Sequence, residues 1–195
     1  MTTNKKMPPS SLKHLVFFTF QTATRKVKVS QATFARWVKN GLIFQAGRNL
    51  YYHPEAKIRA ETLHFVVACR KFGPKSAIAG LSALFHYRLV EQVPEQIWVL
   101  VPPSKISRNP LYRCIRSKTT IKHGIDTFDS YRITNLERTL VEAFKFATKI
   151  GPRIAIQASR TALKEGLTTE KKLAQMAENL KLTKVFRKYW ESVVL

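Results

Sequence analysis

The order of apolar and polar positions predicts a helical N-terminal region. From Ser10 or Ser11, the run SLKHLVFFTFQTA predicts a helix for which a serine supplies the N-cap. A shorter second helix is predicted within residues 22–28. A stronger helix is predicted over 31–40, because apolar side chains recur there at helical spacing.

The predicted helix at 31–40 has recognisable signals at both ends. Ser30 is the expected N-cap, and Gly41 occupies the left-handed position at which many helices end. At about 100° per residue, Phe34 and Trp37 fall on one side with Val38. This side is expected to be buried. The opposite side, which is expected to be exposed, carries Ala32, Arg36 and Lys39.

A hairpin is predicted directly after this helix. The segments LIFQ and NLYYH flank Ala46-Gly47-Arg48-Asn49, in which glycine and asparagine accept positive φ. Residues 55–90 then read as helices that are interrupted at Gly73-Pro74. Strands are predicted within 96–116 and near 124–133. From Thr134, which is the expected cap, the chain reads as helical to its end.

Charge is distributed unevenly along the chain. The formal net charge is +22, and residues 1–54 hold nine basic side chains and no Asp or Glu. A solvated face normally mixes both signs, so this pattern favours a module that binds a polyanion. We therefore place a domain boundary at Glu55. The predicted fold class is α+β, with a winged helix-turn-helix at 1–54 and a larger mixed α/β domain at 55–195 whose C-terminal half is helical.

Double-stranded DNA is the expected polyanion, because an α-helix fits its major groove. Arg36 suits guanine, Gln31 or Asn40 suits adenine, and Lys39 suits phosphate. Arg48 at the hairpin tip suits the DNA backbone or the minor groove. The expected DNA-binding residues are Arg25, Lys26, Lys28, Gln31, Thr33, Arg36, Lys39, Asn40, Arg48 and Asn49.

The sequence offers little for catalysis, and we expect no enzyme activity, no metal and no cofactor. Glu55-x-Lys57 resembles a fragment of a metal-dependent nuclease motif, but no acid precedes it to complete a Mg²⁺ site. Asp126 and Asp129 favour a salt bridge or a turn over a metal site. Gly80-Leu81-Ser82 lies in a helical context, so its serine is expected to be a helix residue and not a nucleophile.

The expected compartment is the cytoplasm. The longest early apolar run, at 15–20, is too short for a membrane span or a signal peptide. Cys69 and Cys114 stand alone in the sequence, which favours reduced, partly buried thiols.

Three motifs in order resemble the AbiEi family, the antitoxin half of a phage-defence toxin–antitoxin pair. These are GRNLYYHP at 47–54, IAGLSALFHYRLVEQVPEQIWVLVP at 78–102 and YRITNLERTLVEAF at 131–144. Glu142 stands where that family's pattern leads us to expect Asp. The resemblance implies a winged-helix domain that binds the operon's own promoter at inverted repeats in the DNA. It also implies a C-terminal domain that opposes a nucleotidyltransferase-like toxin without a stable complex (type IV).

Two alternatives to this interpretation stay open. The basic surface would also suit a small nuclease or an accessory subunit, or an RNA-binding module.

Within the C-terminal region, Arg138 is expected to pair with Glu142 at i,i+4, although a contact with nucleic acid or a partner is the alternative. Arg153, Arg160 and Lys164 form either a solvated basic face or a second basic surface for nucleic acid.

Overall fold

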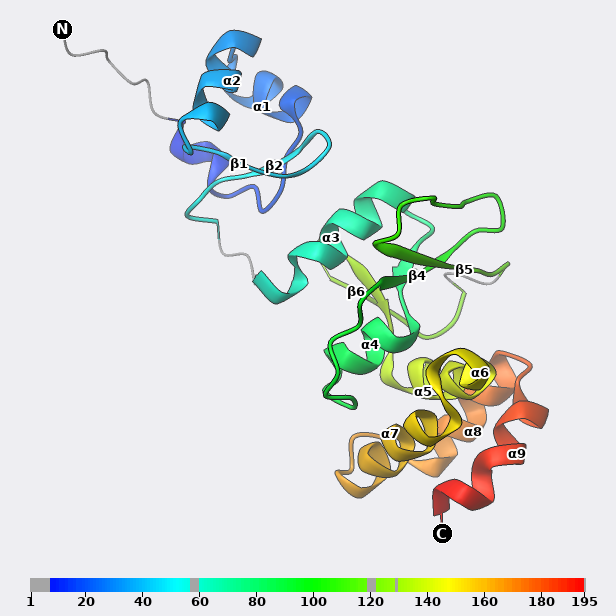
Figure 1. Ribbon diagram of the computed structural model, residues 1–195. Coiled ribbons are helices and arrows are strands. Elements are labelled where there is room, and N and C mark those ends of the chain that lie inside the picture. Colours follow the sequence, from blue (N-terminus) through cyan, green and yellow to red (C-terminus); the bar gives the residue numbers. More distant parts are fainter. Residues whose placement is uncertain (1–7, 57–59, 119–121, 129, 195) are drawn as a thin grey trace, which may run out of the picture. The chain divides into compact units, whose positions relative to one another are not determined.

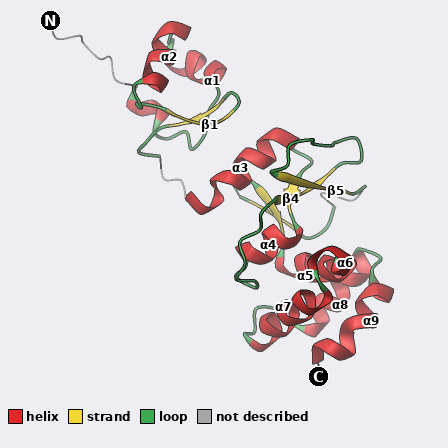
Figure 2. Ribbon diagram, in the orientation of Figure 1, coloured by secondary structure: helices red, strands yellow, loops and turns green. Residues whose placement is uncertain are grey.

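The computed structural model describes residues 8–56, 60–118, 122–128 and 130–194 (Figure 1). Helices predominate and two sheets are present, so the predicted α+β class is confirmed (Figure 2). The chain divides into two compact units, Met1–Val67 and Ala68–Leu195. This division lies inside helix α3 (Ala60–Phe72), whereas the change in charge lies at Glu55.

Within residues 8–56, the N-terminal unit contains two α-helices and one hairpin. Their bounds are η1 Ser10–Leu12 (a single 3₁₀ turn), α1 Phe20–Val27, α2 Gln31–Lys39, β1 Phe44–Gly47 and β2 Leu50–Tyr52. The strands β1 and β2 pair antiparallel, with an irregularity between Gln45 and Gly47. The predicted helix at 31–40 and the predicted hairpin are confirmed.

The long helix predicted from Ser10 through the apolar run is wrong. Among residues 8–19, only η1 is helical, because the backbone at Phe18 pairs with Tyr51 in an isolated antiparallel bridge with both N···O distances at 2.9 Å. Extended backbone lets Phe17 and Phe18 both reach buried positions. Thr19 then caps α1 by accepting from the Thr22 N–H at 3.1 Å.

Phe34 on α2 lies at the centre of the small core of this unit. Its ring makes edge-on contacts with Phe18, Phe20 and Tyr51, at centroid distances of 6.5, 5.2 and 4.8 Å. Trp37 lies 6.3 Å away on the same helix. The buried side chains of the cluster are Leu12, Phe18, Ala23, Val29, Phe34, Trp37 and Ile43.

The C-terminal unit is built on a five-stranded mixed sheet. The strands are β3 Ala77–Ile78, β4 Ile97–Val101, β5 Tyr112–Arg116, β6 Ile125–Thr127 and β7 Arg132–Thr134, in the order β5-β4-β3-β7-β6. The pairs β4–β5 and β3–β7 are parallel, and the other two neighbouring pairs are antiparallel. The predicted strands in 96–116 are confirmed, and the segment near 124–133 forms two strands.

The strand β3 corrects the helical reading of 76–89. This segment begins with two buried strand residues, and helix α4 (Gly80–His86) follows. A strand therefore does precede Gly80-Leu81-Ser82, contrary to the sequence reading. Ser82 is nevertheless a helix residue as expected, since its hydroxyl accepts from the Trp98 N–H at 2.9 Å and donates to the Gln96 carbonyl at 3.3 Å.

Helices make up the rest of the C-terminal unit. They are α5 Leu136–Lys145, α6 Ala147–Ile150, α7 Pro152–Lys164, α8 Glu170–Asn179 and α9 Thr183–Val194. The cap predicted at Thr134 is wrong, because Thr134 ends β7 and the Asn135 side chain accepts from the Arg138 N–H at 2.9 Å. Pro152 lies in the first turn of α7, and the Thr169 side chain caps α8 by accepting from the Lys172 N–H at 3.3 Å.

These elements cover both faces of the sheet. Trp98 of β4 faces α4 and α5 and joins the core that they share with α7, α8 and α9. On the opposite face, Phe72 at the end of α3 packs edge-on against Tyr112 of β5 at 5.3 Å. Gly80, with φ +54°, lies so close to Trp98 that an added Cβ would be 2.5 Å from the indole ring.

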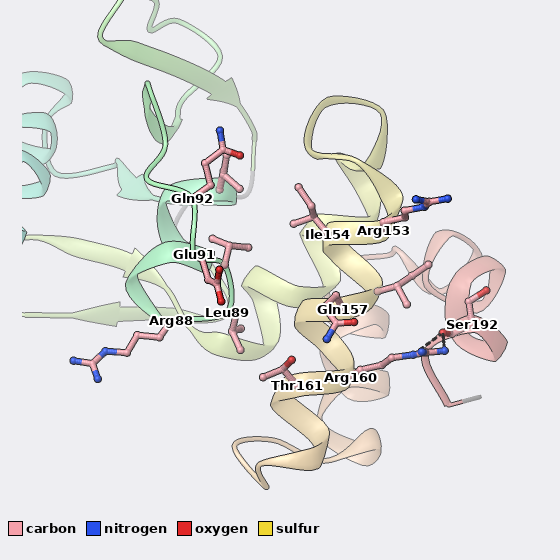
Figure 3. Close-up of a pocket in the computed structure, with 13 residues that line it drawn as sticks. Arg88, Leu89, Glu91, Gln92, Arg153, Ile154, Gln157, Arg160, Thr161 and Ser192 are labelled. Carbon is pink, nitrogen blue, oxygen red and sulfur yellow. Dashed lines mark hydrogen bonds between the residues drawn. The ribbon is translucent and has the colours of Figure 1, made fainter.

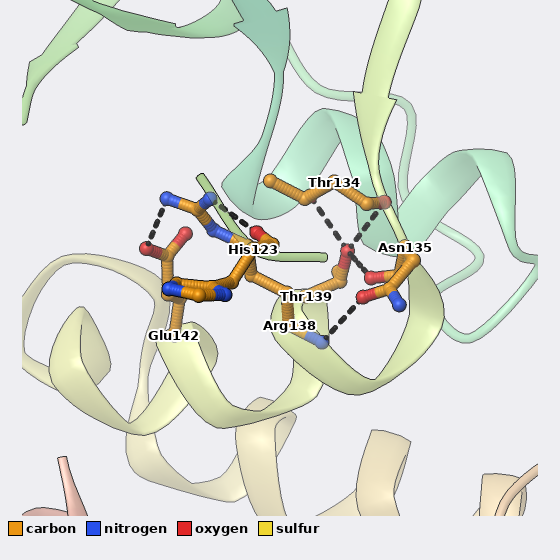
Figure 4. Close-up of polar contacts among 6 residues, drawn as sticks. All are labelled: His123, Thr134, Asn135, Arg138, Thr139 and Glu142. Carbon is orange, nitrogen blue, oxygen red and sulfur yellow. Dashed lines mark hydrogen bonds and ion pairs between the residues drawn. The ribbon is translucent and has the colours of Figure 1, made fainter. Parts of the chain in front are cut away.

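A buried ion pair lies within α5, and its arginine also contacts the segment before β6 (Figure 4). The Arg138 guanidinium contacts the Glu142 carboxylate at 3.1 Å, and both side chains are almost fully buried. Another guanidinium nitrogen donates to the His123 carbonyl at 2.7 Å. The predicted i,i+4 pair is therefore confirmed, and Arg138 is held inside the protein.

Candidate nucleic-acid interface

Helix α2 separates its buried side chains from its basic ones. Phe34 and Trp37 point into the core, while Gln31, Arg36, Lys39 and Asn40 are exposed. Ser30 caps the helix, because its hydroxyl accepts from the Thr33 N–H at 3.3 Å. The Thr33 hydroxyl lies 3.1 Å from that of Ser30, so this half-buried threonine belongs to the cap as well as to the candidate interface.

The end of α1 brings three further basic side chains to the surface of this unit. Arg25 and Lys26 lie in the last turn of α1, and both are exposed. Lys28 has a left-handed backbone with φ +48°, and its N–H donates to the Thr24 carbonyl at 2.9 Å. With buried Val29 and the cap Ser30, it forms a three-residue connection between α1 and α2.

The hairpin tip is held against the start of α1. Asn49 has φ +52°, and its side-chain oxygen accepts from the Phe20 N–H at 3.2 Å. This contact fixes the turn and leaves the side-chain amide nitrogen of Asn49 as its available donor. Arg48 is exposed at the same tip. The hairpin thus presents one cation at a position fixed relative to the two helices.

The charges of this surface lack internal compensation. Glu55 is the first acid in the chain, and it pairs with Lys13. The hydrogen bond and positive charge of Lys13 lower the pKa of the Glu55 carboxyl. Within residues 8–56, no ion pair involves the exposed cations of the candidate interface, which are Arg25, Lys26, Lys28, Arg36, Lys39 and Arg48.

The N-termini of α1 and α2 also lack acidic neighbours. Neither α1 nor α2 carries Asp or Glu in its first turn, where acids commonly offset the positive end of the helix dipole. Several first-turn N–H groups already donate within the protein, from Phe20 to Asn49, from Thr22 to Thr19 and from Thr33 to Ser30. The surface is therefore suited to an anion mainly by the charge of its side chains.

The second basic surface lies on α7 in the C-terminal unit. Arg153, Arg160 and Lys164 are all exposed along this helix. Arg160 already has a hydrogen-bond partner within the protein, because two of its nitrogens donate to the Ser192 carbonyl near the end of α9, at 3.1 and 2.8 Å. One of the three cations therefore helps to hold α9 in place.

The residues considered for catalysis do not assemble into a reactive site. Lys57 and Asp129 lie outside the described residues. Asp126 accepts from the Tyr87 hydroxyl at 3.2 Å, and burial together with this carboxylate raises the pKa of Tyr87. Among the described residues, no three His, Cys, Asp or Glu side chains gather where they could hold a metal ion. Cys69 and Cys114 are both free thiols, as predicted.

No protein-family model and no curated protein sequence matches the chain. In the described part of the chain, no helix has both the length and the apolar character needed to cross a membrane.

Proposed function

We propose that the protein binds double-stranded DNA in a sequence-specific manner, with residues 1–54 acting as a winged helix-turn-helix. The order of elements supports this proposal: an extended residue at Phe18, helix α1, a three-residue connection, helix α2 and a hairpin. A second helix placed across a short turn from the first is the usual layout of a major-groove reading head.

The observation that carries the proposal is the set of exposed cations on α1, α2 and the hairpin tip, with which no carboxylate forms an ion pair among the described residues. A protein that neutralises DNA phosphates needs cations whose charge is not already balanced by carboxylates. In the N-terminal unit, the exposed cations of α1, α2 and the hairpin tip meet this condition. The buried aromatic side of α2 fixes the helix and directs its polar side outward.

The proposal gives each side chain a role according to its position. Arg36 lies in the middle of the exposed side of α2 and contacts guanine, while Gln31 or Asn40 contacts adenine. Lys39 and the α1 cations Arg25 and Lys26 contact phosphate, which sets the position of the protein without reading sequence.

The cellular role that we propose follows from the motif resemblance. The protein represses its own promoter in the cytoplasm and acts as an AbiEi-like type IV antitoxin against a nucleotidyltransferase-like toxin. The three motifs at 47–54, 78–102 and 131–144 support this role. In this proposal the protein is a binding protein and not an enzyme.

A binding titration with the full chain tests the proposal. The probes are a fluorescent duplex from the region upstream of the gene, a shuffled duplex of equal composition and a structured RNA. We expect the upstream duplex to bind most tightly, and log affinity to fall with log salt by about 0.9 per phosphate contact. Equal affinity for both duplexes would contradict sequence-specific binding. Tighter binding to RNA, or Mg²⁺-dependent cleavage of plasmid DNA, would favour one of the two alternatives.

The antitoxin role needs a separate measurement. The gene next to this one is expressed from an inducible promoter with and without the full chain, and growth is recorded. We expect the neighbouring gene to stop growth and the full chain to restore it. If the neighbouring gene has no effect on growth, the antitoxin part of the proposal is wrong, and DNA binding still stands on its own titration.

A further inference from the structure

A groove in the C-terminal unit runs along helix α7. Its volume is about 810 Å³, and its walls are α7 and the segment 88–92 that follows α4. Figure 3 shows Gln157 and Thr161 on α7 facing Leu89 across the groove. We call this feature the α7 groove and define it by Leu81, Leu89, Ile154, Gln157, Arg160 and Thr161.

The α7 groove continues past the hydrogen bonds between Arg160 and Ser192. A second hollow of about 570 Å³ shares Gln157, Arg160 and Thr161 with it and extends to Lys164. From Arg153 to Lys164, the axis of α7 rises by roughly 16 Å. The concave surface is thus open and elongated, with a length that suits about three turns of a helix or a short peptide.

The floor and the rim of the α7 groove differ in chemistry. The floor is aliphatic and includes Leu81, Leu89 and Ile154. Arg88 and Arg153 lie at opposite ends of the rim and point outward, as Figure 3 shows. In the described part of the chain, neither of these arginines takes part in an ion pair. Among the described residues, the acidic side chains along this surface are Glu91 in the α7 groove, and Glu165 and Glu170 in the hollow that continues it.

This chemistry favours a protein segment over a nucleic acid. Single-stranded nucleic acids bind by stacking bases on aromatic rings, and no aromatic side chain is among the described residues that line the groove. A DNA or RNA backbone is anionic and offers little apolar surface to leucine and isoleucine beyond the C–H groups of its sugars. An amphipathic helix places its apolar side in such a groove and its charged flanks at the rim.

We propose that the α7 groove binds an amphipathic helix with acidic flanks from a partner protein. Apolar side chains at helical spacing contact Leu89 and Ile154, and flanking carboxylates approach Arg88 and Arg153. The net charge of +22 on this chain favours a partner whose contacting surface is acidic. This inference does not depend on DNA binding by the N-terminal unit.

Selection from a phage-displayed library of random 16-residue peptides tests the inference on the full chain. Peptides that bind the variant Gln157→Trp are first removed from the library. In this variant an indole fills the groove from an exposed position on α7, so the peptides removed are those that bind elsewhere on the protein. We expect the enriched peptides to carry apolar residues at i, i+3 or i+4, and i+7, with Asp or Glu on both sides. Enrichment of acidic peptides without this apolar spacing would overturn the proposal, as would the absence of any enriched peptide.

An enriched peptide is then labelled and titrated against matched charge variants. Arg153→Glu should weaken peptide binding about fivefold, because reversal replaces an attraction at the rim with a repulsion. Lys149→Glu makes the same charge change at an exposed site on α6, outside the groove, and should alter affinity less than about twofold. Equal effects of the two variants would show that net charge alone drives binding and would overturn the proposal.

A final arm separates the peptide from nucleic acid. The labelled peptide is competed with an unlabelled 20-nucleotide single strand and with a duplex. If Arg153→Glu weakened either oligonucleotide more than it weakened the peptide, the α7 groove would belong to a nucleic-acid surface and the proposal would be wrong.

Discussion

Replacing Phe34 by alanine should remove most of the stability of the N-terminal unit. Its side chain is only 4% exposed, and its ring contacts four other aromatic rings. Truncating a buried phenylalanine to alanine costs about 4 kcal/mol, which lowers the folding equilibrium constant roughly 1000-fold. A folded unit of this size is stable by roughly 3–7 kcal/mol, so this single change consumes most of that margin.

Differential scanning calorimetry of the full chain measures this effect. We expect two transitions, one for each compact unit, with only the N-terminal one lowered in Phe34→Ala. The expected shift is roughly 15–30 °C, at about 4–8 °C per kcal/mol for a small domain. DNA binding should fall in parallel, because α2 loses the packing that positions it.

Phe44→Ala is the matched control, since it makes the same chemical change in the same unit. Phe44 is 44% exposed on β1, so its truncation should cost less than about 1 kcal/mol. Equal shifts in the two variants, or a wild-type melting temperature in Phe34→Ala, would show that Phe34 does not hold the core of this unit together.

Three further predictions concern single positions in the two units. Glu142→Ala leaves a buried arginine without its carboxylate and should cost about 3–5 kcal/mol in urea unfolding; a loss under about 1 kcal/mol would contradict this. Gly80→Ala forces a Cβ against Trp98, whereas Gly166→Ala also has positive φ but adds its Cβ into open space. In thermal unfolding, Gly80→Ala should therefore lower the free energy of unfolding by at least about 2 kcal/mol more than Gly166→Ala. Equal losses would show that the close contact has no energetic effect. Burial lowers the pKa of His53 from 6.5, so its contribution to stability is present above pH 6.5 and is lost as pH falls below that value; the melting temperature of the N-terminal unit should drop between pH 7 and pH 5, and less so in His53→Gln.

Local signals were sufficient to predict the candidate interface. Ser30 and Gly41 mark the two ends of α2 through side-chain capping and positive φ, and both depend only on nearby backbone. The spacing of Phe34 and Trp37 then fixes which side of the helix is buried. Arg36 follows as exposed without any knowledge of the tertiary structure.

The elements that the sequence did not predict depend on distant partners. Phe18 is extended because it pairs with Tyr51, and nothing in the apolar run around it indicates that pairing. The two-residue strand β3 is too short to show an alternating pattern, and it exists because β4 and β7 flank it. The α7 groove likewise needs two segments that lie far apart in the sequence, so only the basic residues of α7 were predictable.

The ratio of affinities for the upstream duplex and a shuffled duplex, measured at several salt concentrations, shows most directly whether α2 reads the DNA sequence. Arg36→Ala should lower that ratio by about 1–3 kcal/mol, or about 5- to 150-fold, because an arginine at guanine discriminates between bases. Lys26→Ala and Arg48→Ala should weaken both duplexes alike and reduce the salt slope by about 0.9 each. An unchanged ratio in Arg36→Ala, with binding otherwise intact, would show that α2 is not the helix that reads DNA.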